Sequence, residues 1–189
     1  MLLSLQLHSD KNSEIYSFID DNAQYFLTVI KEEGSNFEDN PDEFKEKLKN
    51  IWEPMVDIKV VSRLILSKDI HSNATDEQIV TFEERTKKVL LDKYVTTLIE
   101  FGNYNIETIE DIKVTKRRYE VSMKFYSASD SFITKFTVYK DSNGDYKIVN
   151  IIIDGINLGL TFRNSFQDTY IQYNKDLDKA IEAWRPTTF

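Results

Sequence analysis

The sequence predicts an α+β domain, in which N-terminal helices pack on one face of a twisted antiparallel sheet of about four strands and C-terminal helices follow. Two observations predict this fold: apolar residues recur at helical spacing up to Gly102, and beyond it they alternate with polar residues. Helices that precede a run of hairpin-linked strands are typical of this class. A chain of 189 residues most simply forms one domain, so residues 1–189 are treated as a single unit.

Four helices are expected before the sheet, at residues 13–33, 41–52, 56–66 and 75–101. Asn40 and Pro41 are typical of an N-cap followed by proline at the first helical position, and Pro54 ends that helix. Thr75 with Gln78 predicts a capping box at the start of the longest helix.

Strands are expected at residues 106–114, 119–125, 132–138 and 146–153. Asn143-Gly144 tolerates the positive φ values of a tight turn, so the last two strands should form a hairpin. The last strand carries apolar residues of both parities, so it should be covered on both faces, or on one face and at one end. Asp154-Gly155 is interpreted as the turn that ends this strand, before helices at 158–173 and 176–184.

The composition argues against several function classes. The 24 Lys and Arg residues against 32 Asp and Glu residues give a net charge of -8, which disfavours nucleic-acid binding and standing adsorption to an anionic membrane. Cysteine is absent, and His8 and His71 lie far apart, so no metal site and no cofactor are expected. The start, residues 1–9, is apolar apart from interruptions such as Ser4 and Gln6 and lacks the basic region of a complete signal peptide, so residues 1–12 are expected to be disordered or the remnant of an export signal.

Several short segments of this sequence occur in the same order and at similar spacing as in a known protein family. They are Val56-Asp57, Leu64-Ile65-Leu66, Thr75, Gln78, Phe82, Leu91, Tyr94, Leu98, Tyr146, Ile148, Ile153-Asp154-Gly155-Ile156, Arg163 and Phe166. Through these pieces the chain resembles, from Ser13 to Trp184, the MlaC or toluene-tolerance family of periplasmic phospholipid-binding carriers. It departs from the family's tendencies at Tyr146, Asn150-Ile151, Asn157 and Ser67, where the family tends to have Trp, Asp-Val, Ser and Gly.

The resemblance implies an exported, periplasmic protein in which helices and sheet form an NTF2-like cone around a deep apolar cavity for phospholipid acyl chains. It also implies two partners, an outer-membrane lipoprotein complex resembling MlaA and an inner-membrane ABC transporter with an MCE-domain subunit resembling MlaD. Shuttling of lipid between them would support the lipid asymmetry of a Gram-negative outer membrane. Such a carrier needs no catalytic residue, so the protein is not expected to be an enzyme, and it is expected to be a monomer.

Lipid-binding residues are hypothesised on two walls of this cavity. The sheet wall consists of Tyr119, Val121, Met123, Phe125, Phe136, Val138, Ile151 and Ile153, and the helix wall of Val60, Leu64, Phe82, Leu90, Tyr94 and Leu98. A solidly packed helix-on-sheet core has the same periodicity, so each of these residues fits a core position equally well. Arg163 either pairs with a lipid phosphate near the mouth or forms an ion pair with Asp168 or Glu100.

Two other function classes stay open. An NTF2-like isomerase or dehydratase acting on a small apolar substrate would need Asp154, Tyr94 or His71 to face one another in the pocket. A pure interaction module would have a filled concave face and an exposed apolar patch instead. Asp154 itself is more simply explained as a turn or capping residue than as a catalytic acid.

Overall fold

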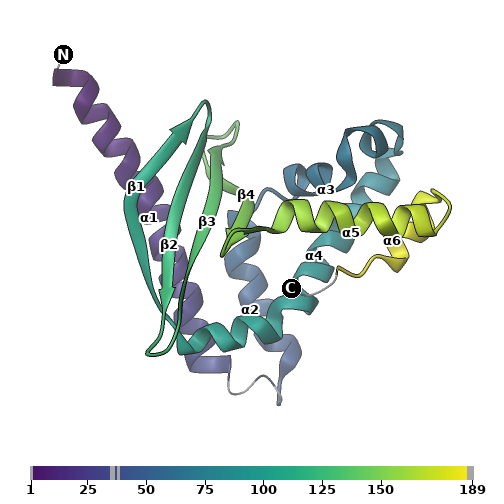
Figure 1. Ribbon diagram of the computed structural model, residues 1–189, viewed down its shortest axis with the longest axis horizontal. Helices are drawn as coiled ribbons and strands as arrows, with labels where there is room; N and C mark the ends of the chain where they lie inside the picture. Colours follow the sequence, from purple (N-terminus) through teal and green to yellow (C-terminus); the bar gives the residue numbers. More distant parts are fainter. Residues whose placement is uncertain (1, 35–36, 38, 187–189) are drawn as a thin grey trace.

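The structure, a computed structural model, describes residues 2–34, 37 and 39–186, and for residues 2–12 and 93–97 it describes the backbone alone. The helices are α1 (Leu2–Glu33), α2 (Pro41–Trp52), α3 (Ile58–Asn73), α4 (Asp76–Glu100), α5 (Leu158–Gln172) and α6 (Leu177–Ala183), with the short 3₁₀ helices η2 (Glu53–Met55) and η3 (Phe101–Asn103) (Figure 1). The strands are β1 (Asn105–Thr115), β2 (Arg118–Tyr126), β3 (Ser131–Lys140), β4 (Tyr146–Ile153) and β5 (Ile156–Asn157). Within this part of the chain, no helix combines the length and the apolar character needed to cross a membrane. The predicted α+β fold is confirmed.

The five strands form one antiparallel sheet in which each strand pairs with the next along the chain. The sequence predicted about four strands, and the fifth is the two-residue β5. It exists because Asp154 and Gly155 both have positive φ, 47° and 81°, as a tight two-residue hairpin turn requires, so that Ile153 pairs with Ile156. The interpretation of Asp154-Gly155 as a turn is therefore confirmed.

Helix α1 lies across one face of the sheet (Figure 1). Its Ile15 and Ile19 are buried in a group that we call the sheet cluster: Ile15, Ile19, Ile112, Val121, Met123, Val138 and Ile148. The helix begins at Leu2, well before the predicted Ser13. No glycine or proline occurs between Leu2 and Glu33, so nothing in the sequence breaks the helix earlier.

Two further clusters complete the core. The bundle cluster lies among α3, α4, α5 and α6, which group beside β4 (Figure 1), and consists of Ile65, Leu66, Phe82, Val89, Phe162, Phe166, Ala180, Ile181 and Trp184. At its centre the Phe82 ring lies 4.7 Å from that of Phe166 and 5.4 Å from that of Trp184, measured between centroids. The α1–α2 cluster consists of Val29, Ile30, Phe44 and Leu48. The core is thus divided among three groups of buried side chains.

Asp57 connects the helical bundle to the sheet. Its backbone N–H donates to the carbonyl of Ile148 at 3.1 Å, and Oδ1 accepts from the N–H of Val60 at 3.0 Å, which caps the start of α3. Oδ2 accepts a hydrogen bond from the hydroxyl of Tyr139 on β3. One side chain therefore fixes where α3 begins and how it sits against β3 and β4.

The start of α5 is held by two asparagines. Asn157 caps the helix by accepting from the N–H of Leu160 at 3.1 Å, and Asn150 of β4 accepts from the N–H of Gly159 at 3.1 Å. A Cβ atom at position 159 would lie only 2.6 Å from Oδ1 of Asn150, so the close approach requires glycine.

Helix α3 consists of two helical segments that meet at a kink at Ser67, so its first segment ends at Leu66, as predicted, and a second segment continues to Asn73. Ser67 has φ 68° and ψ 163°, a region of backbone conformation that is essentially restricted to glycine. The family that this sequence resembles tends to have Gly at position 67. The backbone conformation of Ser67 gives a physical reason for that preference. The serine keeps the kink at a cost in backbone strain.

The strain at Ser67 predicts that Ser67→Gly stabilises the protein by about 1 kcal/mol, because glycine adopts this conformation without a Cβ clash. Thermal unfolding followed by circular dichroism measures the change, expected as a rise in Tm of roughly 2–4 °C for a chain of this size. Ser72→Gly, in the regular part of the same helix, is the matched control and should lower stability by up to about 1 kcal/mol. A loss of stability in Ser67→Gly would contradict the strained conformation.

The bond to Asp57, together with burial, raises the pKa of Tyr139 from its ordinary value of 10.0 to about 12. Neutral Tyr139 therefore stabilises the fold fully below about pH 10, and that contribution is lost as the pH rises toward about 12. Tyr139→Phe should cost roughly 1.5–3 kcal/mol at neutral pH, as expected for a hydrogen bond to a carboxylate.

Urea unfolding of both proteins across alkaline pH tests this assignment. The stability difference between wild type and Tyr139→Phe should be constant at lower pH and shrink between about pH 10 and 12. Tyr126→Phe, at an exposed position of β2, should leave the stability within about 0.5 kcal/mol of wild type. A difference that stays constant through this range would show that Asp57 does not hold the Tyr139 hydroxyl.

Candidate functional site

The residues hypothesised as the sheet wall lie on one face of β2, β3 and β4. Val121, Met123 and Val138 are fully buried in the sheet cluster, and Tyr119, Phe125, Phe136 and Ile151 pack against it while half-buried. Ile153 is half-buried at the end of β4. This face packs against Ile15 and Ile19 of α1.

The residues hypothesised as the helix wall are distributed over the molecule. Phe82 belongs to the bundle cluster and Leu90 packs against it, whereas Leu98 packs against the α1–α2 cluster. Val60 and Leu64 are half-buried in the first half of α3. The side chain of Tyr94 lies outside the described residues. The structure therefore brings the sheet wall together, and it assigns the described helix-wall residues to different groups.

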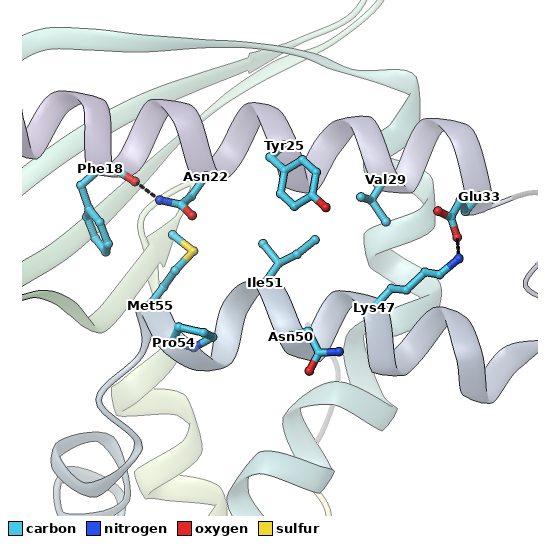
Figure 2. Close-up of a pocket in the computed structure, with 10 residues that line it drawn as sticks. All are labelled: Phe18, Asn22, Tyr25, Val29, Glu33, Lys47, Asn50, Ile51, Pro54 and Met55. Atoms are coloured by element: carbon cyan, nitrogen blue, oxygen red, sulfur yellow. Dashed lines mark hydrogen bonds and ion pairs between the residues drawn. The ribbon is translucent and has the colours of Figure 1, made fainter.

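A groove of about 540 Å³ runs between α1 and α2. Figure 2 shows the ten side chains that line it: Phe18, Asn22, Tyr25, Val29, Glu33, Lys47, Asn50, Ile51, Pro54 and Met55. Phe18 and Met55 pack against the sheet cluster, Val29 belongs to the α1–α2 cluster, and Ile51 packs against that second cluster. The groove thus opens over the seam between two apolar clusters.

The charged groups of the groove stand at one end of it (Figure 2). Lys47 Nζ lies 2.6 Å from Glu33 Oε2 and 3.1 Å from Glu43 Oε1. Hydrogen bonds to these two carboxylates raise the pKa of Lys47, so the lysine stays charged and paired. Farther along, Asn22 Nδ2 donates to the carbonyl of Phe18 at 2.7 Å. Apart from Asn22, Asn50, Glu33 and Lys47, the lining consists of Phe18, Tyr25, Val29, Ile51, Pro54 and Met55 and is therefore largely apolar.

A second hollow of about 470 Å³ continues from this groove and shares Phe18 and Pro54 with it. Its other lining residues are Glu14, Lys140, Gly144, Asp145, Tyr146 and Lys147. Lys140 Nζ lies 3.1 Å from Glu14 Oε2 and 4.5 Å from the centroid of the Tyr146 ring. The combined groove therefore passes from an apolar middle to a polar end.

Sequence reasoning did not single out Tyr25, Ile51 or Met55 as site residues. A signal existed in α1, because Phe18, Tyr25 and Val29 are spaced by seven and four residues and so share one helix face. That face borders the groove, whereas Ile15 and Ile19 face the sheet.

Arg163 has a backbone partner, which is neither of the acids considered as its ion-pair partners from the sequence. Its Nε donates to the carbonyl of Leu64 at 2.6 Å. Leu64 lies three residues before the kink at Ser67, where the last carbonyls of a helical segment lack their regular donors. Among the described residues Arg163 forms no ion pair with Asp168 or Glu100, so Arg163 ties α5 to the first half of α3.

The residues of the enzyme alternative occupy different parts of the fold. Asp154 is exposed in the turn between β4 and β5, and His71 is half-buried near the end of α3. The side chain of Tyr94 is not among those described. The described side chains include no group of three or more histidines or carboxylates that could hold a metal ion.

Comparison with known proteins gives consistent matches. The family model described as MlaC protein matches residues 20–186. The toluene tolerance protein Ttg2D of Pseudomonas putida is 31% identical over 159 residues, which cover 84% of this chain and 74% of that protein. A solved structure from Ralstonia solanacearum, described as a phospholipid-binding protein in complex with a phospholipid, superposes with a TM-score of 0.76 at 19% identity and covers 87% of this chain and 90% of its own. This last likeness concerns the fold.

The bond between Arg163 and Leu64 predicts that Arg163→Ala lowers the free energy of unfolding by about 1.5–3 kcal/mol, because a charged donor is lost from the kink. Chemical denaturation measures the change. Arg63→Ala, at an exposed position on α3, is the control and should stay within about 0.5 kcal/mol of wild type. Equal stability of Arg163→Ala and wild type would contradict the structural role of Arg163.

Proposed function

The chain belongs to the MlaC protein family, and we propose that it is a periplasmic carrier that binds the acyl chains of a phospholipid and shuttles the lipid between two membranes. The observation that carries this proposal is the groove between α1 and α2, which opens over the seam between two apolar clusters. The phospholipid bound to the Ralstonia protein of the same fold supports the choice of ligand.

The physical need for such a carrier follows from the cost of exposing acyl chains to water. Each CH₂ group gains about 0.8 kcal/mol when it is shielded, and two chains carry roughly 30 such groups. A lipid therefore does not cross an aqueous space unprotected. Inside an apolar interior the chains have surroundings similar to a bilayer, so the transfer itself needs no catalytic group.

The proposed lipid path begins in the groove and continues into the seam below it. Phe136 and Ile151 of the sheet wall and Leu98 of the helix wall are half-buried beside the clusters that border this seam. An acyl chain that entered between these clusters would cover the remaining exposed surface of such side chains, at about 25 cal/mol per Å². Entry requires α1 and α2 to move apart, which widens the groove.

The proposed partners are an outer-membrane lipoprotein complex like MlaA and an inner-membrane ABC transporter with an MCE-domain subunit like MlaD. Transfer between two apolar environments is nearly balanced in free energy, so docking at these partners would set its direction. By this traffic the protein would support the lipid asymmetry of the outer membrane.

Native mass spectrometry and lipid extraction of the gently purified protein test the carrier function. The wild type should carry phospholipid, and Ile51→Trp should retain at least threefold less, because the larger ring fills the groove where the chains enter. Ile109→Trp is the matched control, because Ile109 is 37% exposed on β1 and does not line the groove. It should retain lipid like the wild type.

The two possible failures are distinguishable. A wild-type protein without bound phospholipid would contradict the carrier function itself. Equal retention by wild type and Ile51→Trp would contradict only the proposed entry through the groove.

A further inference from the structure

Four cations gather at one end of a protein that is acidic overall. Lys113, Lys116, Arg117 and Arg118 lie within six residues, and all four are exposed. Glu120 stands opposite Lys113 in the ladder, but it pairs with Lys135 at 3.4 Å instead. Among the described residues, none of the four cations forms an ion pair. We call residues 113–118 the basic tip.

The basic tip is the turn between β1 and β2. Thr115 pairs with Arg118, so the turn contains only Lys116 and Arg117. Strand β1 starts next to η3 and runs away from it, which places the tip at the end of the sheet remote from the last turn of α4 (Figure 1). Val114, an apolar residue between the cations, is 54% exposed.

The turn holds Lys116 in a conformation that is unusual for lysine. Its φ is 56°, in the left-handed region where turns normally place Gly, Asn or Asp. A lysine is disfavoured there, because its Cβ crowds the backbone. A two-residue hairpin turn requires such a positive φ, so the lysine is kept at this position at a cost in backbone strain.

We propose that the basic tip docks the protein transiently on a lipid surface that exposes anionic phosphate head groups. Polybasic segments are attracted to such surfaces by about 1 kcal/mol per Lys or Arg, which is weak enough for repeated release. The cations extend from an exposed two-residue turn and the strand ends beside it, and this spread arrangement favours a diffuse head-group layer over a defined acidic peptide. Val114 would enter the same layer with its apolar side chain.

This inference goes beyond the carrying of lipid, because it concerns the outer surface and requires no bound cargo. The net charge of -8 disfavours adsorption of the whole protein, but it does not exclude a local contact. Repulsion of the acidic remainder would instead orient the protein with its tip toward the lipid.

Cosedimentation of the full chain with vesicles tests the proposal. Wild type should bind vesicles of equal parts phosphatidylglycerol and phosphatidylcholine at about 50 mM salt, and binding should fall sharply at about 300 mM salt. Vesicles of phosphatidylcholine alone should not bind it. The double variant Lys116→Glu, Arg117→Glu should lose at least about tenfold in partitioning onto the anionic vesicles.

Lys59→Glu with Lys68→Glu is the matched control, because it makes the same change in net charge at two exposed helical positions outside the tip. It should stay within about threefold of wild type. Lys116→Gly separates binding from folding: it should bind about fivefold more weakly, while relief of the left-handed conformation leaves Tm unchanged or raises it.

Three results would overturn the proposal: no binding of wild type to anionic vesicles, equal binding to both kinds of vesicle, or equal loss in the tip and control variants. If the basic tip instead binds an acidic protein, wild type will not bind anionic vesicles, which is the first of these three results. Retained phospholipid, measured on the same preparations by mass spectrometry, reports on the carrier function separately.

Discussion

The carboxylate of Asp57 is the constraint on which the arrangement of sheet and helices depends. It caps α3 through the N–H of Val60 and accepts the hydroxyl proton of Tyr139, while the backbone of the same residue bonds to Ile148. Removal of the carboxylate would leave a helix end and a phenol without their acceptor at once. Because α3 packs against α4 and α5 in the bundle cluster, the placement of the whole bundle follows from this junction.

Three clusters with seams between them behave differently from one continuous core. Side chains within each cluster are closely packed and resist rearrangement, so a change of shape is confined to the boundaries. The groove of Figure 2 lies on one such boundary, and the junction at Asp57 keeps the bundle attached to the sheet. Under the proposed function, a guest would enter at this boundary, between the sheet cluster and the α1–α2 cluster, instead of within either of them.

Local signals made much of the fold predictable. The capping box of Thr75 and Gln78 forms as predicted, and β3 and β4 form the predicted hairpin, joined by a loop of residues 141–145 in which Gly144 has φ 91°. The second segment of α3, after the kink, was not predictable, because the kink position carries serine although its backbone conformation favours glycine.

The alternation of apolar and polar residues along the strands identified the inward face of the sheet. It could not tell which helix covers that face, since packing of α1 against the sheet is a choice between distant parts of the chain. For the same reason the groove, which two helices share, has no signature in either helix alone.

The contact between Asn150 and Gly159 sets a rule for how this sequence can vary. Nine residues separate them along the chain, yet the amide of one occupies the space that a methyl group on the other would need. Alanine at position 159 is expected to be tolerated only beside a shorter residue at position 150, which then gives up its bond to the start of α5. The effects of substitutions at these two positions on stability are therefore expected to be non-additive, and related sequences should change both residues together.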